Sequence, residues 1–178
     1  MNASSDAIQK WCEELDQYQP QPWERMPEIY LYMDQVLSYM EKQLGIFDRN
    51  GEGVLTSSMV NNYVKAGVLP RPEKKKYSRD HLAMLTMICM LKSSLSIPDI
   101  SSLMNLLREE SGEQEMYSRF SEAQQSAIDE VCSRLQEGVS GGKDSLIHLA
   151  AELSIEASMR RAAAEKILSE LTKPEAES

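Results

Sequence analysis

The sequence predicts a mainly α-helical protein, and three observations lead to this fold class. Apolar residues recur every three or four positions through several long stretches, which is the spacing of one buried face of a helix. Prolines, glycines and short polar runs divide these stretches into pieces of helical length. Alternation of apolar and polar residues, which is typical of a half-buried strand, is confined to one candidate pair around KKKY at 74–77.

The amino-terminal part is expected to hold two helices joined by a connector. Residues 5–18 are predicted to form a short helix, which ends at YQPQPWERMP because proline lacks a backbone donor and biases the preceding residue toward extended conformations. We interpret residues 19–27 as the connector. From Glu28, apolar residues at helical spacing continue to Leu44, and Gly45 stands at the position of a carboxyl-terminal cap.

Capping residues mark the start of three further helices. Thr56 precedes SSMVNNYVKA, and Gly67 closes that stretch. Ser78 precedes a second stretch with apolar residues on one face. Ser96, with Asp99 three residues later, resembles a capping arrangement at the start of a third stretch, IPDISSLMNLL.

Two more helices are predicted beyond a polar break at 111–113. One lies within 114–137 and ends at GVSGGKD, and the last runs from 145 to 171. Eight residues of the last helix follow the four-three repeat of a coiled-coil seam: Leu146, Ala150, Leu153, Ala157, Arg160, Ala164, Ile167 and Leu171. Two interpretations stay open, pairing of two chains along this seam or packing of the seam on its own domain, and Arg160 weakens the first.

Length, cysteine content and hydropathy restrict the class of protein. A chain of 178 residues can form one compact domain with a core, or a small domain with a helical extension. Cys12, Cys89 and Cys132 are far apart and in no disulfide or metal pattern. The amino terminus lacks a signal-peptide pattern, and no stretch approaches the roughly 20 apolar residues that cross a bilayer. We expect a cytoplasmic protein that does not bind a membrane.

The charge is unevenly distributed. The whole chain carries a formal net charge of -9, which argues against binding to nucleic acid. The stretch from Thr56 to Lys92 has seven basic and two acidic residues, which gives +5 and leaves -14 for the remainder. This asymmetry favours a basic binding face on an acidic body, and a solvated lysine run on a loop is the alternative.

Three motifs that suggest chemistry fail at a decisive position. The polar loop at 48–55 resembles the first half of a calcium-binding EF-hand, but Met59 stands where the bidentate glutamate is required. The GGK at 141–143 resembles a phosphate-binding loop, but no strand precedes it. His81 and His148 have no partner at a catalytic or metal-binding spacing. We therefore expect no cofactor, no metal and no enzymatic activity.

A set of short motifs follows in fixed order between residues 56 and 107: NNYVKAGVLP, a basic loop, a tyrosine, and LSIPDISSLM. This order resembles the DNA-binding domain of the MerR family, in which a recognition helix ending in a tyrosine and GLLP precedes a wing, a tyrosine and two helices. The resemblance implies a winged helix-turn-helix. Asn61 replaces the usual arginine, and the loop at 46–55 replaces the usual first helix, so the helix at 28–44 would take that place.

A second resemblance is closer. LYMDQV at 31–36, LTSSMVNNYVK at 55–65, KKKY at 74–77 and LSIPDI at 95–100 are similar to an uncharacterised bacterial family, the domain of unknown function 1836. This resemblance implies a common fold and carries no assigned activity.

Ten residues of this region are the predicted DNA-binding residues: Ser57, Ser58, Asn61, Asn62, Lys65, Arg71, Lys74, Lys75, Lys76 and Arg79. The amides of Asn61 and Asn62 can pair with adenine edges in a major groove, or one of them can hold a buried turn instead. The serines and basic residues suit contacts with phosphate, which position a protein without reading sequence.

The predicted protein is therefore a MerR-like winged helix-turn-helix with an additional N-terminal helix and C-terminal helices. Residues 1–27 hold the first helix and the connector, residues 28–110 the winged domain, and residues 111–178 a region for dimerisation or for sensing an effector. The predicted function is transcriptional regulation by a homodimer that binds double-stranded DNA. The alternative is a protein-protein interaction module that keeps the winged shape and binds a protein partner through its acidic helices.

Overall fold

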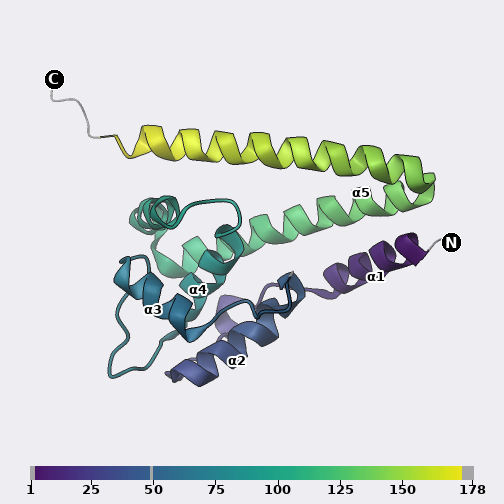
Figure 1. Ribbon diagram of the computed structural model, residues 1–178. Coiled ribbons are helices and arrows are strands. Elements are labelled where there is room, and N and C mark those ends of the chain that lie inside the picture. Colours follow the sequence, from purple (N-terminus) through teal and green to yellow (C-terminus); the bar gives the residue numbers. More distant parts are fainter. Residues whose placement is uncertain (1–2, 49, 174–178) are drawn as a thin grey trace. The chain divides into compact units, whose positions relative to one another are not determined.

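The computed structural model describes residues 3–48 and 50–173, and the chain is mainly helical, as predicted (Figure 1). Its elements are α1 (Ala3–Gln17), the short 3-10 helix η1 (Trp23–Arg25), α2 (Met33–Leu44), the 3-10 helix η2 (Gly45–Phe47), α3 (Ser57–Lys65), α4 (Arg79–Leu91) and α5 (Ile97–Leu171). The chain forms two compact units. The first unit comprises residues up to 20 together with 121–162, and the second comprises 21–120 together with the residues after 162.

The helix α5 is not one straight rod, because two glycines interrupt it. Gly112 has φ +74° and Gly142 has φ +83°, a left-handed conformation that glycine adopts without steric cost. Across the second break, Arg134 contacts Glu156, which a straight helix would place roughly 33 Å away at 1.5 Å per residue. The chain therefore reverses near Gly142, within the predicted stop at 138–144, and the other break falls within the predicted one at 111–113.

In the first unit, α1 packs on the helical hairpin formed by residues 121–162. Its core consists of Cys12, Leu135 and Leu149, and three half-buried residues pack against it: Ile8, Val131 and Leu153. The three cysteines of the chain are buried free thiols. Two residues of the predicted coiled-coil seam are thus used inside the hairpin. Leu153 packs against this core, and Leu146 lies, with Leu149, against Gly138.

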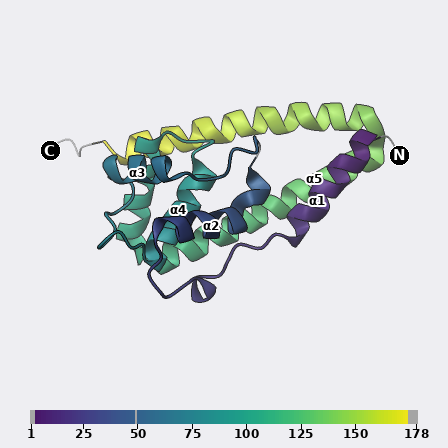
Figure 2. The same ribbon diagram turned by 60° about the horizontal axis from the view of Figure 1, so that its bottom comes forward.

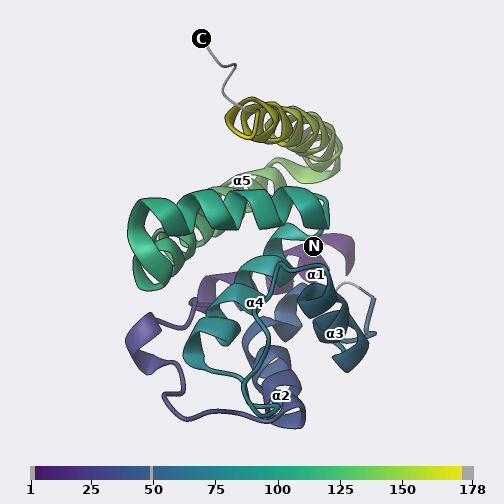
Figure 3. The ribbon, with the colours of Figure 1, turned by 90° about the vertical axis from the view of Figure 1, so that its left-hand side faces the viewer.

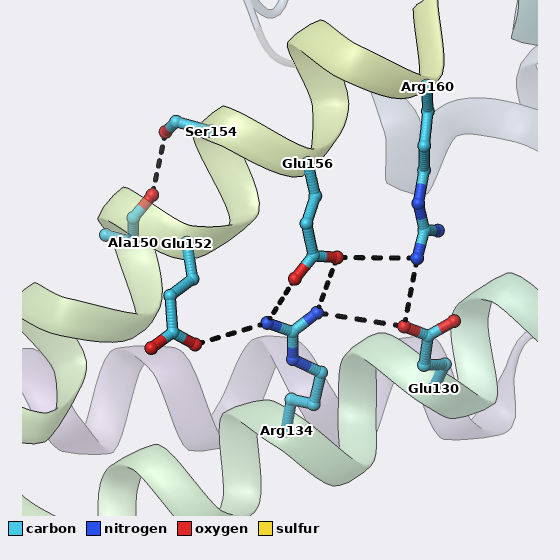
Figure 4. Close-up of polar contacts among 7 residues, drawn as sticks. All are labelled: Glu130, Arg134, Ala150, Glu152, Ser154, Glu156 and Arg160. Atoms are coloured by element: carbon cyan, nitrogen blue, oxygen red, sulfur yellow. Dashed lines mark hydrogen bonds and ion pairs between the residues drawn. The ribbon is translucent and has the colours of Figure 1, made fainter. Parts of the chain in front are cut away.

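A network of charged side chains joins the two limbs of this hairpin (Figure 4). The guanidinium of Arg134 makes two 2.8 Å contacts with the carboxylate of Glu156, and lies 3.4 Å from Glu152 on the same limb. Arg160 contacts both Glu156 and Glu130, each at 3.3 Å. The hydrogen bond from Arg134 is the main reason why the pKa of the Glu156 carboxyl lies below its usual value. Arg160, an unusual residue for a seam, is therefore part of an ion-pair network.

The second unit is built around α4. Eight consecutive residues of this helix are buried, from Leu82 to Cys89. The helix α2 lies beside it, with Met40 at 3.9 Å from the hydroxyl of Thr86 (Figure 2). Thr86 is the one polar residue in this buried run, and its hydroxyl donates to the backbone carbonyl of Leu82 at 2.9 Å. The hydrogen-bonding capacity of the buried hydroxyl is thereby used.

The predicted start of α2 was wrong, whereas its predicted end at Leu44 was confirmed. The helix begins at Met33 and not at Glu28, because Leu31 is extended and pairs with Tyr77. Gly45 caps the helix as predicted, with its backbone amide bonded to the carbonyl of Glu41, but it is not left-handed: its φ is -55°, and the chain continues through η2 to Asp48. The side chain of Asp48 accepts backbone hydrogens from the following turn, which ends the helical conformation there.

Within the described residues, none of the helices combines the length and the apolar character that a membrane span requires.

Replacement of Gly142 by alanine is expected to destabilise the first unit by about 1 kcal/mol, because a Cβ atom makes φ +83° unfavourable. Ser140→Ala is the matched control, since Ser140 is exposed and its hydroxyl donates to the carbonyl of Gln136 one helical turn earlier. Chemical denaturation followed by circular dichroism measures both variants. Equal stability of Gly142→Ala and wild type would contradict the reversal at this glycine.

Arg134→Gln, which removes three ion pairs, is expected to lower Tm more than Arg119→Gln, which removes two. The side chain of Arg134 is 23 % exposed, and two of its partners, Glu152 and Glu156, lie on the opposite limb. That of Arg119 is 54 % exposed and pairs with Glu110 and Glu115, nearby in the sequence. Ion pairs that are more shielded from solvent contribute more to stability. Thermal unfolding at low and high salt measures the difference, and an equal effect of both substitutions contradicts a bridging role for Arg134.

Candidate nucleic-acid interface

The helix α3 presents a polar face to solvent. The hydroxyl of Thr56 accepts a hydrogen bond from the backbone of Met59 at 3.2 Å, so the predicted amino-terminal cap is confirmed. Val60 and Tyr63 are buried and fix the orientation of the helix about its axis. The five predicted contact residues of this helix are consequently exposed: Ser57, Ser58, Asn61, Asn62 and Lys65.

The exit from α3 is a tight turn, as the GVLP sequence predicts. Gly67 adopts φ +75°, and the backbone amides of Val68 and Leu69 both donate to the carbonyl of Tyr63. Leu69 is almost completely buried. Burial also raises the pKa of Tyr63 to about 12, so this tyrosine is a neutral core residue. The turn directs the following basic loop away from the end of α3.

The basic loop contains a two-residue turn at 73–76, here called the lysine turn. The amide of Lys76 donates to the carbonyl of Glu73 at 2.8 Å, and Lys74 and Lys75 have φ of 49° and 62°. Two successive positive φ angles define a type I′ turn, which normally carries Asn-Gly. For residues other than glycine this conformation costs about 1–2 kcal/mol each. Two exposed lysines thus occupy strained positions at the tip of the turn.

The lysine turn is held by the segment that precedes α2 (Figure 3). Leu31 and Tyr77 form an antiparallel bridge with hydrogen bonds of 2.9 and 2.8 Å, and both side chains are buried. Beside this pair, the ammonium of Lys76 lies 5.3 Å from the centre of the Tyr32 ring, a cation–π distance. Lys76 is accordingly half-buried, whereas Lys74 and Lys75 are exposed.

Arg79 differs from the other predicted contact residues, because its charge is engaged inside the unit. Its guanidinium lies 2.9 Å from the carboxylate of Glu28, donates to the carbonyl of Met26 at 3.3 Å and stacks 5.6 Å above the ring of Trp23. These contacts attach the connector to the first turn of α4. Arg71, in contrast, is exposed on the basic loop.

The expected wing is reduced to this turn. A wing is a β-hairpin, and the described residues hold no strand, only the isolated bridges Leu31–Tyr77 and Glu73–Lys76. Pro70 and Pro72 lack backbone donors and only a few residues separate them from Tyr77, so the loop is too short to form a two-stranded ladder. The candidate short pair around KKKY is therefore present only as a bridge.

His81 links the lysine turn to α4. Its Nδ1 accepts the backbone hydrogen of Ser78 at 3.1 Å and lies 2.8 Å from the Ser78 hydroxyl, which fixes the start of the helix. The ring packs edge-on against Tyr77 at 5.5 Å. Burial lowers the pKa of His81, an effect that Asp80 and the backbone of Pro70 and Arg71 partly oppose.

The polar loop at 48–53 resembles a calcium site in sequence because aspartate and glycine also suit the turn that it forms. The carboxylate of Asp48 accepts the backbone hydrogens of Asn50, Gly51 and Gly53 at 2.8–3.2 Å. These bonds, led by the one from Gly53, lower the pKa of Asp48. Aspartate and glycine are thus placed for a tight turn. Across the described part of the chain, no three His, Cys, Asp or Glu side chains are grouped as metal ligands.

Two aromatic residues beside the lysine turn were missed by the sequence analysis. Tyr30 and Tyr32 precede α2 and were assigned to its helical pattern, yet they flank Leu31 on the extended segment that pairs with Tyr77. Both are more than half exposed. The partners are 46 residues apart in the sequence, so no local signal could have brought them together.

Comparison with protein families gives one match, the Domain of unknown function (DUF1836), over residues 21–124. The matched range contains α2, α3, α4 and the lysine turn, and covers more than half of the chain. The chain belongs to the DUF1836 family. Curated proteins and solved structures gave no match. The function of this member of the DUF1836 family therefore has to be argued from its own geometry.

Stability is expected to fall as the pH drops from about 7.5 to about 5.5, in part because of His81. The pKa of His81 is lower in the folded state than in the unfolded state, so protonation favours the unfolded state. The stabilisation that comes from neutral His81 is therefore complete above the unfolded pKa and is lost as the pH falls through the folded pKa. His81→Gln keeps an acceptor for the cap and removes the titration, so its Tm should depend less on pH. His148→Gln, at an exposed position, is the control and should behave as wild type.

Proposed function

We propose that this protein binds double-stranded DNA as a transcriptional regulator, with α3 in the major groove and the lysine turn on the phosphate backbone. The observation that carries this proposal is the combination of an exposed polar helix face and an exposed basic turn in one unit. The sequence of α3 contains no acidic residue. Within the described residues, Lys65, Arg71, Lys74 and Lys75 form no salt bridge.

The chemistry of α3 suits a major groove. Nine helical residues extend over roughly 13 Å at 1.5 Å per residue, which is comparable to the width of the groove. Asn61 and Asn62 are exposed, and their side chains make no hydrogen bond within the described part of the chain. An amide that is not engaged by its own protein can donate to N7 and accept from N6 of adenine. Ser57 and Ser58, in the first turn, suit phosphate oxygens.

The lysine turn suits phosphates and not bases. Lysine ammonium groups are compact charges without directional geometry, so they neutralise phosphates and release counterions. The positions of Lys74 and Lys75 are set by backbone angles and by the bridge at Tyr77, and do not depend on a protein carboxylate. The cost of holding two lysines in a left-handed conformation is consistent with a functional role, because strained residues concentrate at functional sites.

We further propose that two copies bind together, so that two half-sites act as one. Ile155 and Met159 on α5 are exposed apolar residues that a second copy could cover. Sedimentation equilibrium of the free protein measures this association, and a monomer at all concentrations would contradict it.

A protein-protein interaction module is the second candidate, and the net charge of -9 favours it. An acidic surface repels DNA outside the basic segment and suits a basic protein partner. The two functions differ in their dependence on salt, because phosphate contacts release counterions.

The test is fluorescence anisotropy with duplex DNA from upstream of the protein's own gene, across a salt series. Wild type is expected to bind with an affinity that falls steeply with salt, by a slope of about 0.9 for each phosphate neutralised. The triple variant Lys74→Glu, Lys75→Glu, Lys76→Glu should lose this binding.

The matched control is Lys10→Glu, Lys143→Glu, Lys166→Glu, which changes the net charge by the same amount outside the basic segment. It should retain most of the affinity. No binding by folded wild-type protein at low salt would reject DNA and favour the interaction module. Equal loss in both triple variants would mean that net charge, and not the lysine turn, governs binding.

A further inference from the structure

A row of large exposed side chains lies beside the lysine turn. Ile29, Tyr30 and Tyr32 are 70 %, 56 % and 51 % exposed, although the unit has a well-packed core. Single exposed apolar residues are common on protein surfaces, but three within four positions form a patch that needs an explanation. We call residues 29–32 the tyrosine segment.

The register of the Leu31–Tyr77 bridge determines how the tyrosine segment faces the turn. In an antiparallel pair with Leu31 opposite Tyr77, Tyr32 lies opposite Lys76 and Tyr30 opposite Ser78. Side chains alternate along extended backbone, so Tyr30 and Tyr32 share one face while Leu31 points to the core. The distance of 5.3 Å between the Lys76 ammonium and the Tyr32 ring agrees with this arrangement.

The acidic residues near this face do not cancel its positive charge. Glu28 is engaged by Arg79 at 2.9 Å, and the carbonyl of Glu73 accepts the hydrogen bond that closes the lysine turn. Glu73 is exposed on the turn itself and Asp80 lies near Tyr30, so these two carboxylates offset two of the three lysines. A patch of two phenol hydroxyls and an excess of ammonium groups is complementary to a polyanion with regularly spaced oxygens.

We propose that Tyr30 and Tyr32 contact the backbone of duplex DNA beside the lysine turn, so that the tyrosine segment and the turn together replace a β-hairpin wing. This inference rests on the proposed function and assigns residues to it that the sequence analysis did not. The tyrosine hydroxyls donate to phosphate oxygens, as tyrosines do in protein–DNA complexes, and the lysines neutralise the same phosphates. Duplex DNA is the partner that also accounts for the exposed amides of Asn61 and Asn62 in the same unit.

The two kinds of contact have different salt signatures. A lysine that neutralises a phosphate releases a counterion and adds about 0.9 to the slope of log affinity against log salt. A phenol hydroxyl is neutral, so it adds affinity without changing that slope. This difference separates the tyrosines from the lysines in one measurement.

The experiment is anisotropy of a fluorescein-labelled mixed-sequence duplex with the full chain, at several salt concentrations. The double variant Tyr30→Phe, Tyr32→Phe is expected to bind about fivefold more weakly with an unchanged slope, because hydroxyl bonds to charged groups are lost and the rings remain. Lys74→Gln, Lys75→Gln should reduce the slope by about 2. Tyr18→Phe, which removes a hydroxyl in the first unit, should bind as wild type.

A second variant tests the strained turn. Lys75→Gly relieves the left-handed conformation, so it should raise Tm while weakening DNA binding. A residue with a purely structural role would not show this opposition, because its replacement would change stability and binding in the same direction.

The outcomes separate this inference from the proposed function. No binding of duplex by folded wild type overturns both. Steep, salt-dependent binding by wild type, with equal affinity in Tyr30→Phe, Tyr32→Phe, overturns the tyrosine contact alone. Binding to phosphatidylserine vesicles as tight as to duplex, lost in the same variants, would assign the surface to a membrane and likewise overturn it. Circular dichroism melts establish that each variant is folded.

Discussion

The burial of α4 on every side is the constraint on which the second unit depends. Eight consecutive residues from Leu82 to Cys89 are removed from water, so neighbouring elements must cover each face of the helix. The helix α2 covers one face, and the loop ending at Val54 supplies another contact, since the ammonium of Lys92 donates to its carbonyl at 2.8 Å. The first turn of α4 anchors Ser78 through His81. The lysine turn, which directly precedes that cap, is therefore attached to the most deeply buried element of the unit.

The cations of the chain fall into two groups by their environment. Arg79, Lys92 and Arg134 bond to carbonyls or carboxylates of their own unit and stabilise the fold. Lys74 and Lys75 have no such bond within the described residues, and their backbone conformation is unfavourable for lysine. A protein selected only for stability would have Asn-Gly at such a turn. This contrast is why the lysine turn, and not the larger number of charges on α5, is the centre of the proposed interface.

Features that depend on neighbours in the sequence were predicted well. The caps at Thr56 and Ser96 and the end of α3 before Gly67 were confirmed, because each involves a hydrogen bond or a backbone angle within a few residues. Features that depend on distant partners were not. The helical spacing from Glu28 onward could not reveal that residues 29–32 are not helical, since the hydrogen bonds between Leu31 and Tyr77 decide the conformation there. The ten candidate contact residues were chosen by composition and motif and remain predictions, and the engagement of Arg79 by Glu28 and Trp23 was not visible in the sequence.

The four-three repeat of the last helix shows the same division. The sequence by itself determined that an apolar seam exists, and that glycines near 112 and 142 interrupt the helix, because spacing and glycine content are local properties. Only the tertiary structure decided what part of the seam covers: the seam residue Leu153 packs against the buried cluster of Cys12, Leu135 and Leu149 in its own unit. It also decided that Arg160 belongs to an ion-pair network with Glu130, 30 residues earlier. The physical reason is that a pattern specifies which face of a helix avoids water, whereas the partner that covers it is chosen by contacts between residues far apart in the chain.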